Sequence, residues 1–230
     1  MIHETSLSRT VDALNELAFE QRELPSAGRA LVAQWIAGRQ GLKGAYADMF
    51  AGFPAELEQG VVVFTGERIT SASARHILGE EASRALRLLR SSDPDGRAAL
   101  RRANEGMLKR LARAALDPRN SNPGRYCCGK CTVGFWRNLL SGGLDRQEER
   151  LRRGVAEALR GMRAGQGKWR VFPFWYTVLA LSEMDLPEAR AELDYAAPVL
   201  EGAAKRRPPS SIYGKRRHAR ACRVLEQRVG

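Results

Sequence analysis

The sequence predicts an all-α fold, and three observations support this class. In most segments apolar residues recur every three or four positions, which is the spacing of one helix face. Turns rich in Gly, Pro, Asp and Ser separate these segments. Only the run 61–65, between Gly60 and Gly66, is typical of a strand. Because no partner for it can be identified, we expect about nine helices and at most one short strand.

The first half of the chain shows four strong helical patterns. Pro25 and Ser26 break the first of them and cap the next, and short helical pieces are plausible at 46–50 and 54–59. The four predicted helices run from Ser6 to Glu23, through Leu31 to Ile36, from Ser71 or Ser73 to Arg90, and from the turn 91–96 to Leu116.

The second half predicts five further helices, at 132–141, from Asp145 to Met162, at 174–184, at 187–195 and at 213–228. Asp145 and Glu148 have the spacing of a capping box, in which two side chains bond the free amides of the first turn. Pro198 is expected to kink or divide its helix. The segment 174–184 is apolar on nearly every side, which predicts a central helix.

Charge is distributed unevenly and suggests three regions. The formal net charge is +12, and residues 205–230 contribute +8 of it, with nine Lys/Arg and one Asp/Glu. We expect a helical region at 1–117, a Cys- and Trp-containing helical-hairpin region at 124–204 and a basic helix or tail at 205–230. The loop-like segment 117–124 is the expected boundary.

The basic tail predicts contact with nucleic acid or an acidic partner, and a simple solvated tail is the alternative. Its candidate contacts are Lys205, Arg206, Arg207, Lys215, Arg216, Arg217 and Arg220. The first residues show neither the basic nor the apolar part of a signal peptide. The longest apolar run, 171–181, is too short to span a bilayer. With four cysteines, too few for a disulfide scaffold, we expect a cytoplasmic protein with reduced thiols.

A faint internal repeat is visible at an offset of 45 residues. Thr132 then aligns with Thr177, and each copy has a Gly-containing loop, a short apolar helix and a longer polar-faced helix, as in helical-hairpin arrays. The segment Gly165-Gln166-Gly167-Lys168-Trp169, followed by an aromatic-Pro stretch and 176–181, resembles the repeat of the prenyltransferase and terpenoid-cyclase superfamily. The resemblance covers about residues 124–204, or two repeats. It implies part of an α/α toroid, but the family's acidic motif and zinc ligands are not visible, so it implies no activity.

The cysteines form the clearest chemical motif. Cys128 and Cys131 have the spacing of a metal knuckle or redox pair, with Cys127 as an alternative ligand. His218 and Cys222 share a face of the last predicted helix and could complete a zinc site. The alternatives are small buried cysteines at the start of an apolar helix, or a reactive thiol whose pKa is lowered by Lys130 and the helix N-terminus.

Aromatic side chains cluster near residue 172 and could line a ligand groove, with two arginines at its mouth; the alternative is that the aromatics are core. The candidate groove residues are Arg125, Trp169, Arg170, Phe172, Phe174, Trp175 and Tyr176. His76 and Glu80 lie four residues apart and could bind metal, but this spacing is more typical of a solvent-facing polar pair, which we expect here.

Three functions follow, in order of preference. The first is a non-catalytic helical module that binds an apolar or anionic partner in the aromatic groove. The second is a nucleic-acid-associated protein that uses the basic tail. The third is an enzyme that uses Cys127, Cys128 or Cys131 for metal binding or redox chemistry, with zinc as the expected cofactor. No substrate follows from the sequence.

Overall fold

The computed structural model describes residues 1–117 and 122–228 of the chain, and it is mostly helical, at 63%. The expectation of a mostly helical protein is therefore confirmed. Ten helices are seen in this part of the chain: α1 (Leu7–Phe19), α2 (Ser26–Ala37), α3 (Pro54–Gln59), α4 (Ala72–Leu88), α5 (Pro94–Ala115), α6 (Gly129–Ser141), α7 (Gln147–Arg153), α8 (Phe174–Ser182), α9 (Pro187–Ala204) and α10 (Ile212–Glu226).

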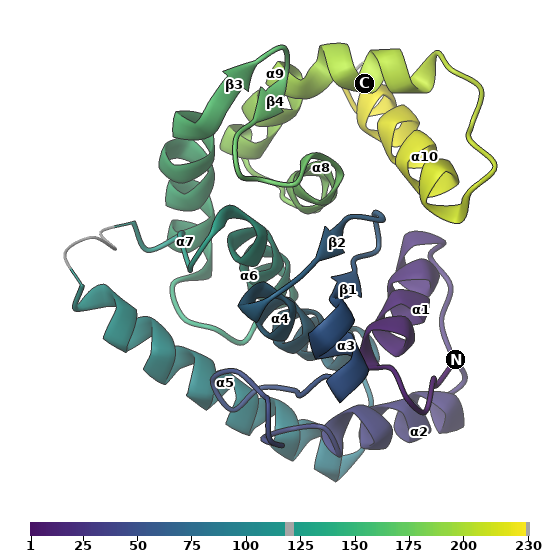
Figure 1. Cartoon of the computed structure of the whole chain (residues 1–230), viewed down its shortest axis with the longest axis vertical. Helices are drawn as coiled ribbons and strands as arrows, with labels where there is room; N and C mark the ends of the chain where they lie inside the picture. Colours follow the sequence, from purple (N-terminus) through teal and green to yellow (C-terminus); the bar gives the residue numbers. More distant parts are fainter. Residues whose placement is uncertain (118–121, 229–230) are drawn as a thin grey trace.

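Helices α4, α6 and α8 occupy the middle of the molecule, and the other long helices lie around them (Figure 1). Helix α4 packs against α6 and α1, while α8 packs against α6 and α9. Most of the side chains of α4 and α6 are buried, as expected for helices covered on several sides. No toroid is evident among the described helices, because these three helices fill the centre.

Two small antiparallel hairpins correct the expectation of at most one strand. Strand β1 (Val61–Val62) pairs with β2 (Arg68–Ile69). Strand β3 (Arg163–Gly165) pairs with β4 (Lys168–Trp169). The strand at Val61 was predicted, but its partner was missed because two residues carry no readable alternation. The sequence predicted that Gly165–Gly167 end a helix, but not that this segment is the turn between two paired strands.

Helix boundaries differ from the predicted ones at several positions. Helix α1 ends at Phe19 rather than near Glu23, α6 begins at Gly129 rather than Thr132, and α9 continues to Ala204. The short helical piece expected at 46–50 does not form. Asp145 accepts from Arg150, with Oδ1 2.8 Å from Nη2, and the N-cap of α7 is Arg146, so the predicted capping box at Asp145 is wrong. Pro198 lies inside the continuous helix α9 and does not divide it. Helix α7 continues as a π-helical segment (Gly154–Leu159) and a 3₁₀ turn (Arg160–Met162). Of the predicted boundary segment 117–124, residues 118–121 lie outside the described part.

One hydrophobic core contains side chains from all three predicted regions, from Leu7 through Trp136 to Val224. Helices α6 and α7, and likewise α8 and α9, contact each other as successive pairs. The aromatic cluster at Trp169 and Phe172 is buried beside these pairs. None of the described helices is long and apolar enough to cross a lipid bilayer.

Candidate metal centre

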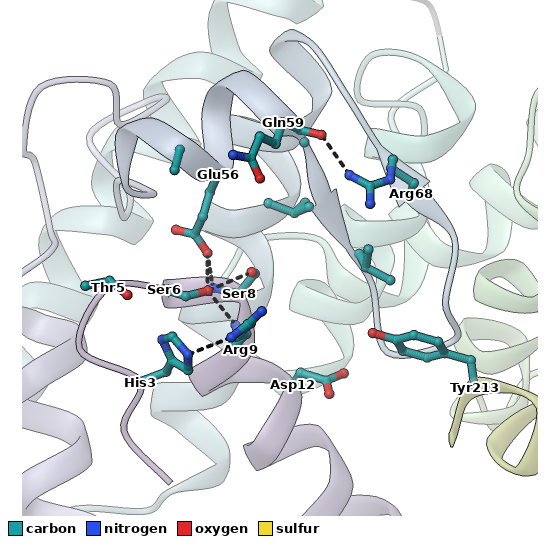
Figure 2. A pocket seen from close by; sticks show the side chains of 14 residues that line it. His3, Thr5, Ser6, Ser8, Arg9, Asp12, Glu56, Gln59, Arg68 and Tyr213 are labelled. Atoms are coloured by element: carbon teal, nitrogen blue, oxygen red, sulfur yellow. Dashed lines mark hydrogen bonds between the residues drawn. The ribbon is translucent and has the colours of Figure 1, made fainter. Parts of the chain in front are cut away.

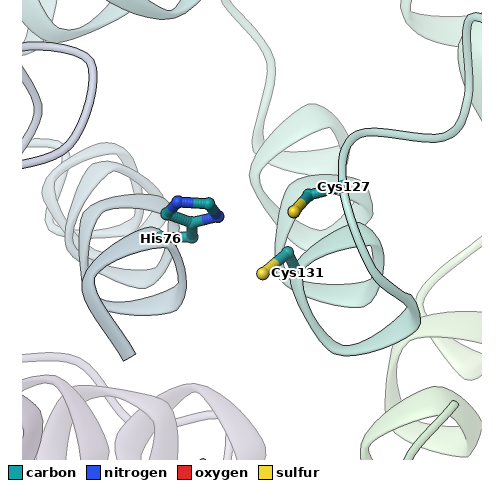
Figure 3. Close-up of side chains that lie close together, drawn as sticks. All are labelled: His76, Cys127 and Cys131. Atoms are coloured by element: carbon teal, nitrogen blue, oxygen red, sulfur yellow. The ribbon is translucent and has the colours of Figure 1, made fainter. Parts of the chain in front are cut away.

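Three potential metal ligands converge where the beginning of α4 meets the beginning of α6. His76 lies on the first turns of α4, Cys127 just precedes α6, and Cys131 lies in its first turn. One ligand atom from each lies within 4.8 Å of the other two. Figure 3 shows the two sulfur atoms directed toward the imidazole ring. Thiolate sulfur and imidazole nitrogen are the donors that zinc and related ions favour.

The position of the cysteines depends on a close approach at Gly129, the first residue of α6. A Cβ atom at Gly129 would lie only 2.3 Å from the carbonyl oxygen of Val171. Glycine therefore lets the segment before α8 pass over the first turn of α6. On the buried side of that turn, Tyr126 is 2% exposed, and its backbone amide donates to the Thr132 hydroxyl at 3.3 Å. The loop that carries Cys127 is thus held against α6 by the bond between Tyr126 and Thr132, and the turn that follows it is covered by the segment at Val171.

Cys128 is the N-cap of α6 and lies beside the three converging ligands. Its sulfur is 3.5 Å from the sulfur of Cys131 and 3.5 Å from the hydroxyl of Ser73. The hydrogen bond with the Cys131 sulfur lowers the pKa of Cys128 to about 4, and the amides at the start of α6 contribute, although burial opposes the shift. For the fully buried Cys131, the hydrogen bond with Cys128 and burial raise the pKa.

His76 is buried among aromatic rings, which corrects the expectation of a solvent-facing pair with Glu80. Its ring lies 3.8 Å from the ring of Tyr46 and 5.6 Å from that of Tyr126. Burial lowers the pKa of His76, so the imidazole is neutral at neutral pH and has a lone pair to donate. Among the described residues nothing hydrogen-bonds its Nδ1, although that atom is buried. An unpaired buried ring nitrogen costs free energy unless a ligand occupies it.

One helical turn further along α4, Glu80 is completely buried. One carboxylate oxygen accepts from the side-chain amide of Asn138 at 2.5 Å, and the other has no partner among the described residues. Burial, with a smaller contribution from Glu81, raises the pKa of Glu80 to about 8. The carboxyl group is therefore mostly protonated at neutral pH and places no full charge in the core.

A charged network joins α4, α6 and α8 on the neighbouring side of α4. Arg137 is 2% exposed and pairs with Glu81 and with Glu183. Arg84 also binds Glu183, at 3.0 Å, and donates to Asn15 of α1 at 2.8 Å. Two guanidinium and two carboxylate groups thus compensate one another. The network fixes α4 relative to α6, the two helices that carry the converging ligands.

The other predicted metal ligands lie elsewhere. His218 and Cys222 are neighbours on α10, with Sγ 3.8 Å from Nδ1, but they do not belong to the His76 group. The ligand expected from α10 is thus replaced by His76 of α4. The sequence did not group His76 with the cysteines because 51 residues separate it from Cys127, and only the packing of α4 on α6 brings them together.

The aromatic residues predicted to line a groove are largely occupied in packing. Trp169 stacks on Phe174 and donates from Nε1 to Glu192 at 2.9 Å. Phe172 stacks on Trp136, and the hydroxyl of Tyr176 donates to Glu81. Trp175 is half-buried and meets Phe174 edge-on. The two arginines, Arg125 and Arg170, are exposed.

The basic residues of the predicted tail divide into two groups. Arg216 is buried and pairs with Asp12 and Glu16 of α1. Arg217 donates to the carbonyl of Thr65 at 2.6 Å, and Arg220 to the hydroxyl of Ser182 at 3.0 Å. These three arginines hold α10 on the body of the protein. The exposed members of the set are Lys205, Arg206, Arg207 and Lys215.

A polar cavity lies away from the cysteines, among α1, α3, the first hairpin and α10 (Figure 2). Its volume is about 380 Å³, and its charged lining includes Arg9, Arg68, Asp12 and Glu56. The two acids are already engaged, because Glu56 accepts from the first amides of α1 and Asp12 pairs with Arg216. Five cavities in the described part of the chain are lined by residues other than His76, Cys127 and Cys131.

The fold and the site together define a helical protein with a thiol-and-imidazole group that could hold a metal ion. Comparison of the chain with protein-family models, with curated proteins and with solved structures gives no match. Function is therefore argued from the residues of the site alone.

Proposed function

We propose that the protein binds one thiophilic divalent metal ion of the zinc class through His76, Cys127 and Cys131. The observation that carries this proposal is the convergence of the three ligand atoms within 4.8 Å, from two helices that are adjacent only in the folded chain. The unpaired, buried Nδ1 of His76 supports it independently, because a bound metal would satisfy that atom.

The distances fit a zinc ion with little rearrangement. Zn–S bonds are about 2.3 Å and Zn–N bonds about 2.0–2.1 Å long, so a tetrahedral site separates two sulfur atoms by about 3.8 Å and sulfur from nitrogen by about 3.6 Å. The three ligand atoms already lie within 4.8 Å of one another. The ligand atoms need to approach one another by about 1 Å to reach these separations. Rotation of the three side chains supplies this movement without a shift of either helix.

The ligand types favour zinc-class ions over magnesium and calcium. Two thiolates and one imidazole suit zinc, whereas magnesium and calcium take oxygen ligands. Three protein ligands leave the fourth tetrahedral position for a water molecule or a substrate, as in catalytic zinc sites. Cys128 lies beside this set, since its sulfur is 3.5 Å from that of Cys131.

The aromatic groove and the basic tail have weaker support. Trp169, Phe172 and Tyr176 are each less than one-tenth exposed and already have packing partners. Arg216, Arg217 and Arg220 are occupied by contacts within the protein. At the metal site, in contrast, three ligand atoms converge and the buried Nδ1 of His76 lacks a partner among the described residues.

Metal content tests the proposal directly. The full chain, purified under reducing conditions with zinc present and then desalted, should retain one zinc per chain by elemental mass spectrometry. His76→Ala and Cys131→Ser should lose the metal. The matched controls are His218→Ala and Cys222→Ser, which change the same residue types outside the site and should keep it. Circular dichroism of each variant establishes that it is folded.

Cobalt binding provides a second test of the metal site, and this test does not depend on any variant. Added to the reduced wild-type chain, Co²⁺ should give the absorption of a tetrahedral thiolate site, and zinc should displace it. A folded, reduced wild-type protein that retains neither metal contradicts the proposal. Equal loss of zinc in Cys222→Ser and Cys131→Ser also contradicts it, because binding would then not depend on the proposed ligands.

A further inference from the structure

We propose that Cys128 and Cys131 form a reversible disulfide and that its formation expels the metal ion, so that the site senses thiol–disulfide state. The metal part rests on the function proposed above. The disulfide part rests on the geometry of α6 alone and is tested independently of metal binding.

The first argument is distance. The two sulfur atoms are 3.5 Å apart, and no other side chain lies between them. A disulfide bond is about 2.0 Å long, so the sulfur atoms must approach by about 1.5 Å. Cys128 is the N-cap, with φ −91° and ψ 173°, and Cys131 lies three residues later in the first turn. Both side chains can make this approach by rotation about χ1, without unwinding the helix.

The second argument is the difference in exposure between the two thiols. Cys131 is fully buried, whereas Cys128 is half-buried and reachable from solvent. Of these two thiols an external disulfide therefore meets Cys128 first, and Cys131 is placed behind it to complete the exchange; the neighbouring Cys127 is also exposed, and Cys127→Ser separates its contribution. The hydroxyl of Ser73, 3.5 Å from the Cys128 sulfur, can donate to that sulfur when it is a thiolate.

The reaction needs an oxidised low-molecular-weight disulfide, such as glutathione disulfide. The Cys128 thiolate attacks one sulfur of that molecule, the S–S bond breaks, and one glutathione thiolate leaves. The Cys131 thiolate then attacks the Cys128 sulfur and releases the second glutathione thiolate. The two protons of the cysteine thiols pass to the two released thiolates. The protein loses two electrons, and one glutathione disulfide becomes two glutathione molecules.

The third argument is that Cys131 belongs to both groups. It is one of the three proposed metal ligands and also one half of the disulfide. A metal ligand must be a thiolate, and a sulfur in a disulfide no longer is one. Oxidation leaves only His76 and Cys127, which is too few for tight zinc binding. The reduced protein therefore holds the metal, and the oxidised protein does not.

The sequence makes the disulfide easy to locate. Cleavage by trypsin after Arg125, Lys130 and Arg137 places Cys128 and Cys131 in different peptides, 126–130 and 131–137. The full metal-free chain is treated with glutathione disulfide, alkylated and digested, and the linked pair of peptides is sought by mass spectrometry. Cys127→Ser should keep the link and Cys128→Ser should lose it. Cys222→Ser is the control and should behave as wild type.

A second arm follows the metal. The zinc-loaded chain is treated with glutathione disulfide, and released zinc is measured with a colorimetric chelator. We expect zinc release and the 128–131 link to rise together and to be reversed by dithiothreitol. Cys128→Ser should keep its zinc under the same treatment. If this variant does not fold, three other results still test the coupling. They are the linked peptides in the wild type, the retention of the link in Cys127→Ser, and the release of zinc in parallel with the link.

The two proposals fail in different ways. A 128–131 link in a chain that never binds zinc overturns the metal function and the coupling but keeps the disulfide. Zinc binding without that link, or with a link from Cys127 instead, overturns the disulfide and leaves the metal function. A 128–131 link that forms while zinc stays bound overturns the coupling.

Discussion

Arg137 of α6 and Glu183, which follows α8, form a two-pronged ion pair in the core, with Nε 3.0 Å from Oε2 and Nη2 3.1 Å from Oε1. Burial alone would raise the pKa of Glu183, but the positive charges of Arg137 and Arg84 outweigh it and hold that pKa at about 2. The pair therefore stays ionised at neutral pH and ties together two of the three central helices.

We expect Arg137→Met to destabilise the protein by about 3–5 kcal/mol, because the buried Glu81 and the partly buried Glu183 would lose their main partner. Urea denaturation followed by circular dichroism measures the change. Arg146→Met is the control, since Arg146 pairs with Glu149 on the surface, and it should change stability little. Equal effects of the two substitutions would show that the buried network does not stabilise the fold.

The raised pKa of Glu80 predicts an unusual pH dependence. An unfolded glutamate titrates near 4.5 and the folded one at about 8, so between these values the folded state holds one more proton. Stability therefore falls as pH rises from about 4.5 to about 8, by at most about 1.4 kcal/mol per pH unit. Glu80→Gln should remove this fall and become increasingly stable relative to wild type across the same window.

Unfolding free energies measured at several pH values between 4.5 and 9 provide the test. Glu58→Gln, a substitution of the same kind at an exposed position, is the control. If the stability difference between Glu80→Gln and wild type were constant across the window, Glu80 would not be protonated in the folded protein.

Gly129→Ala should weaken metal retention. The added methyl group would meet the carbonyl of Val171, so the first turn of α6 and the segment before α8 must separate, at a cost of about 1–3 kcal/mol. Zinc stoichiometry after dialysis against a chelator should fall below that of wild type. Gly161→Ala is the matched control, because its methyl group meets no atom within 4 Å. Unchanged zinc in Gly129→Ala would mean that the position of this turn does not set the site.

Adjacent basic residues of α10 should behave differently. Arg216 binds Asp12 and the carbonyl of Phe64 and is 5% exposed, whereas Lys215 is exposed. Arg216→Ala should cost roughly 3 kcal/mol, because it leaves acids of α1 without their partner. Lys215→Ala should cost almost nothing. Thermal unfolding compares them, and similar melting temperatures would show that Arg216 does not anchor α10.

Local sequence pattern predicted the helices with useful accuracy. The apolar spacing from Leu7 to Leu17 predicted α1, and the structure adds that the Ser6 side chain caps it by accepting from the amide of Arg9. Two-residue strands such as β3 and β4 were not predicted, because they have no periodicity to detect. A buried charge such as Arg137 was also not predicted, because its partners come from distant helices.

The sequence by itself determined that the chain is mostly helical and that Cys128 and Cys131 lie at the beginning of an apolar helix, since both follow from interactions among near neighbours. That helix, predicted at 132–141, begins at Gly129 in the structure. Only the tertiary structure decided which histidine faces those cysteines. The sequence spacing predicted His218, with Cys222, as the partner of the cysteines, but α4, which carries His76, packs against α6, and α10 packs against α9. The choice depends on which helix faces bury against each other, and that is a property of the whole core rather than of any one segment.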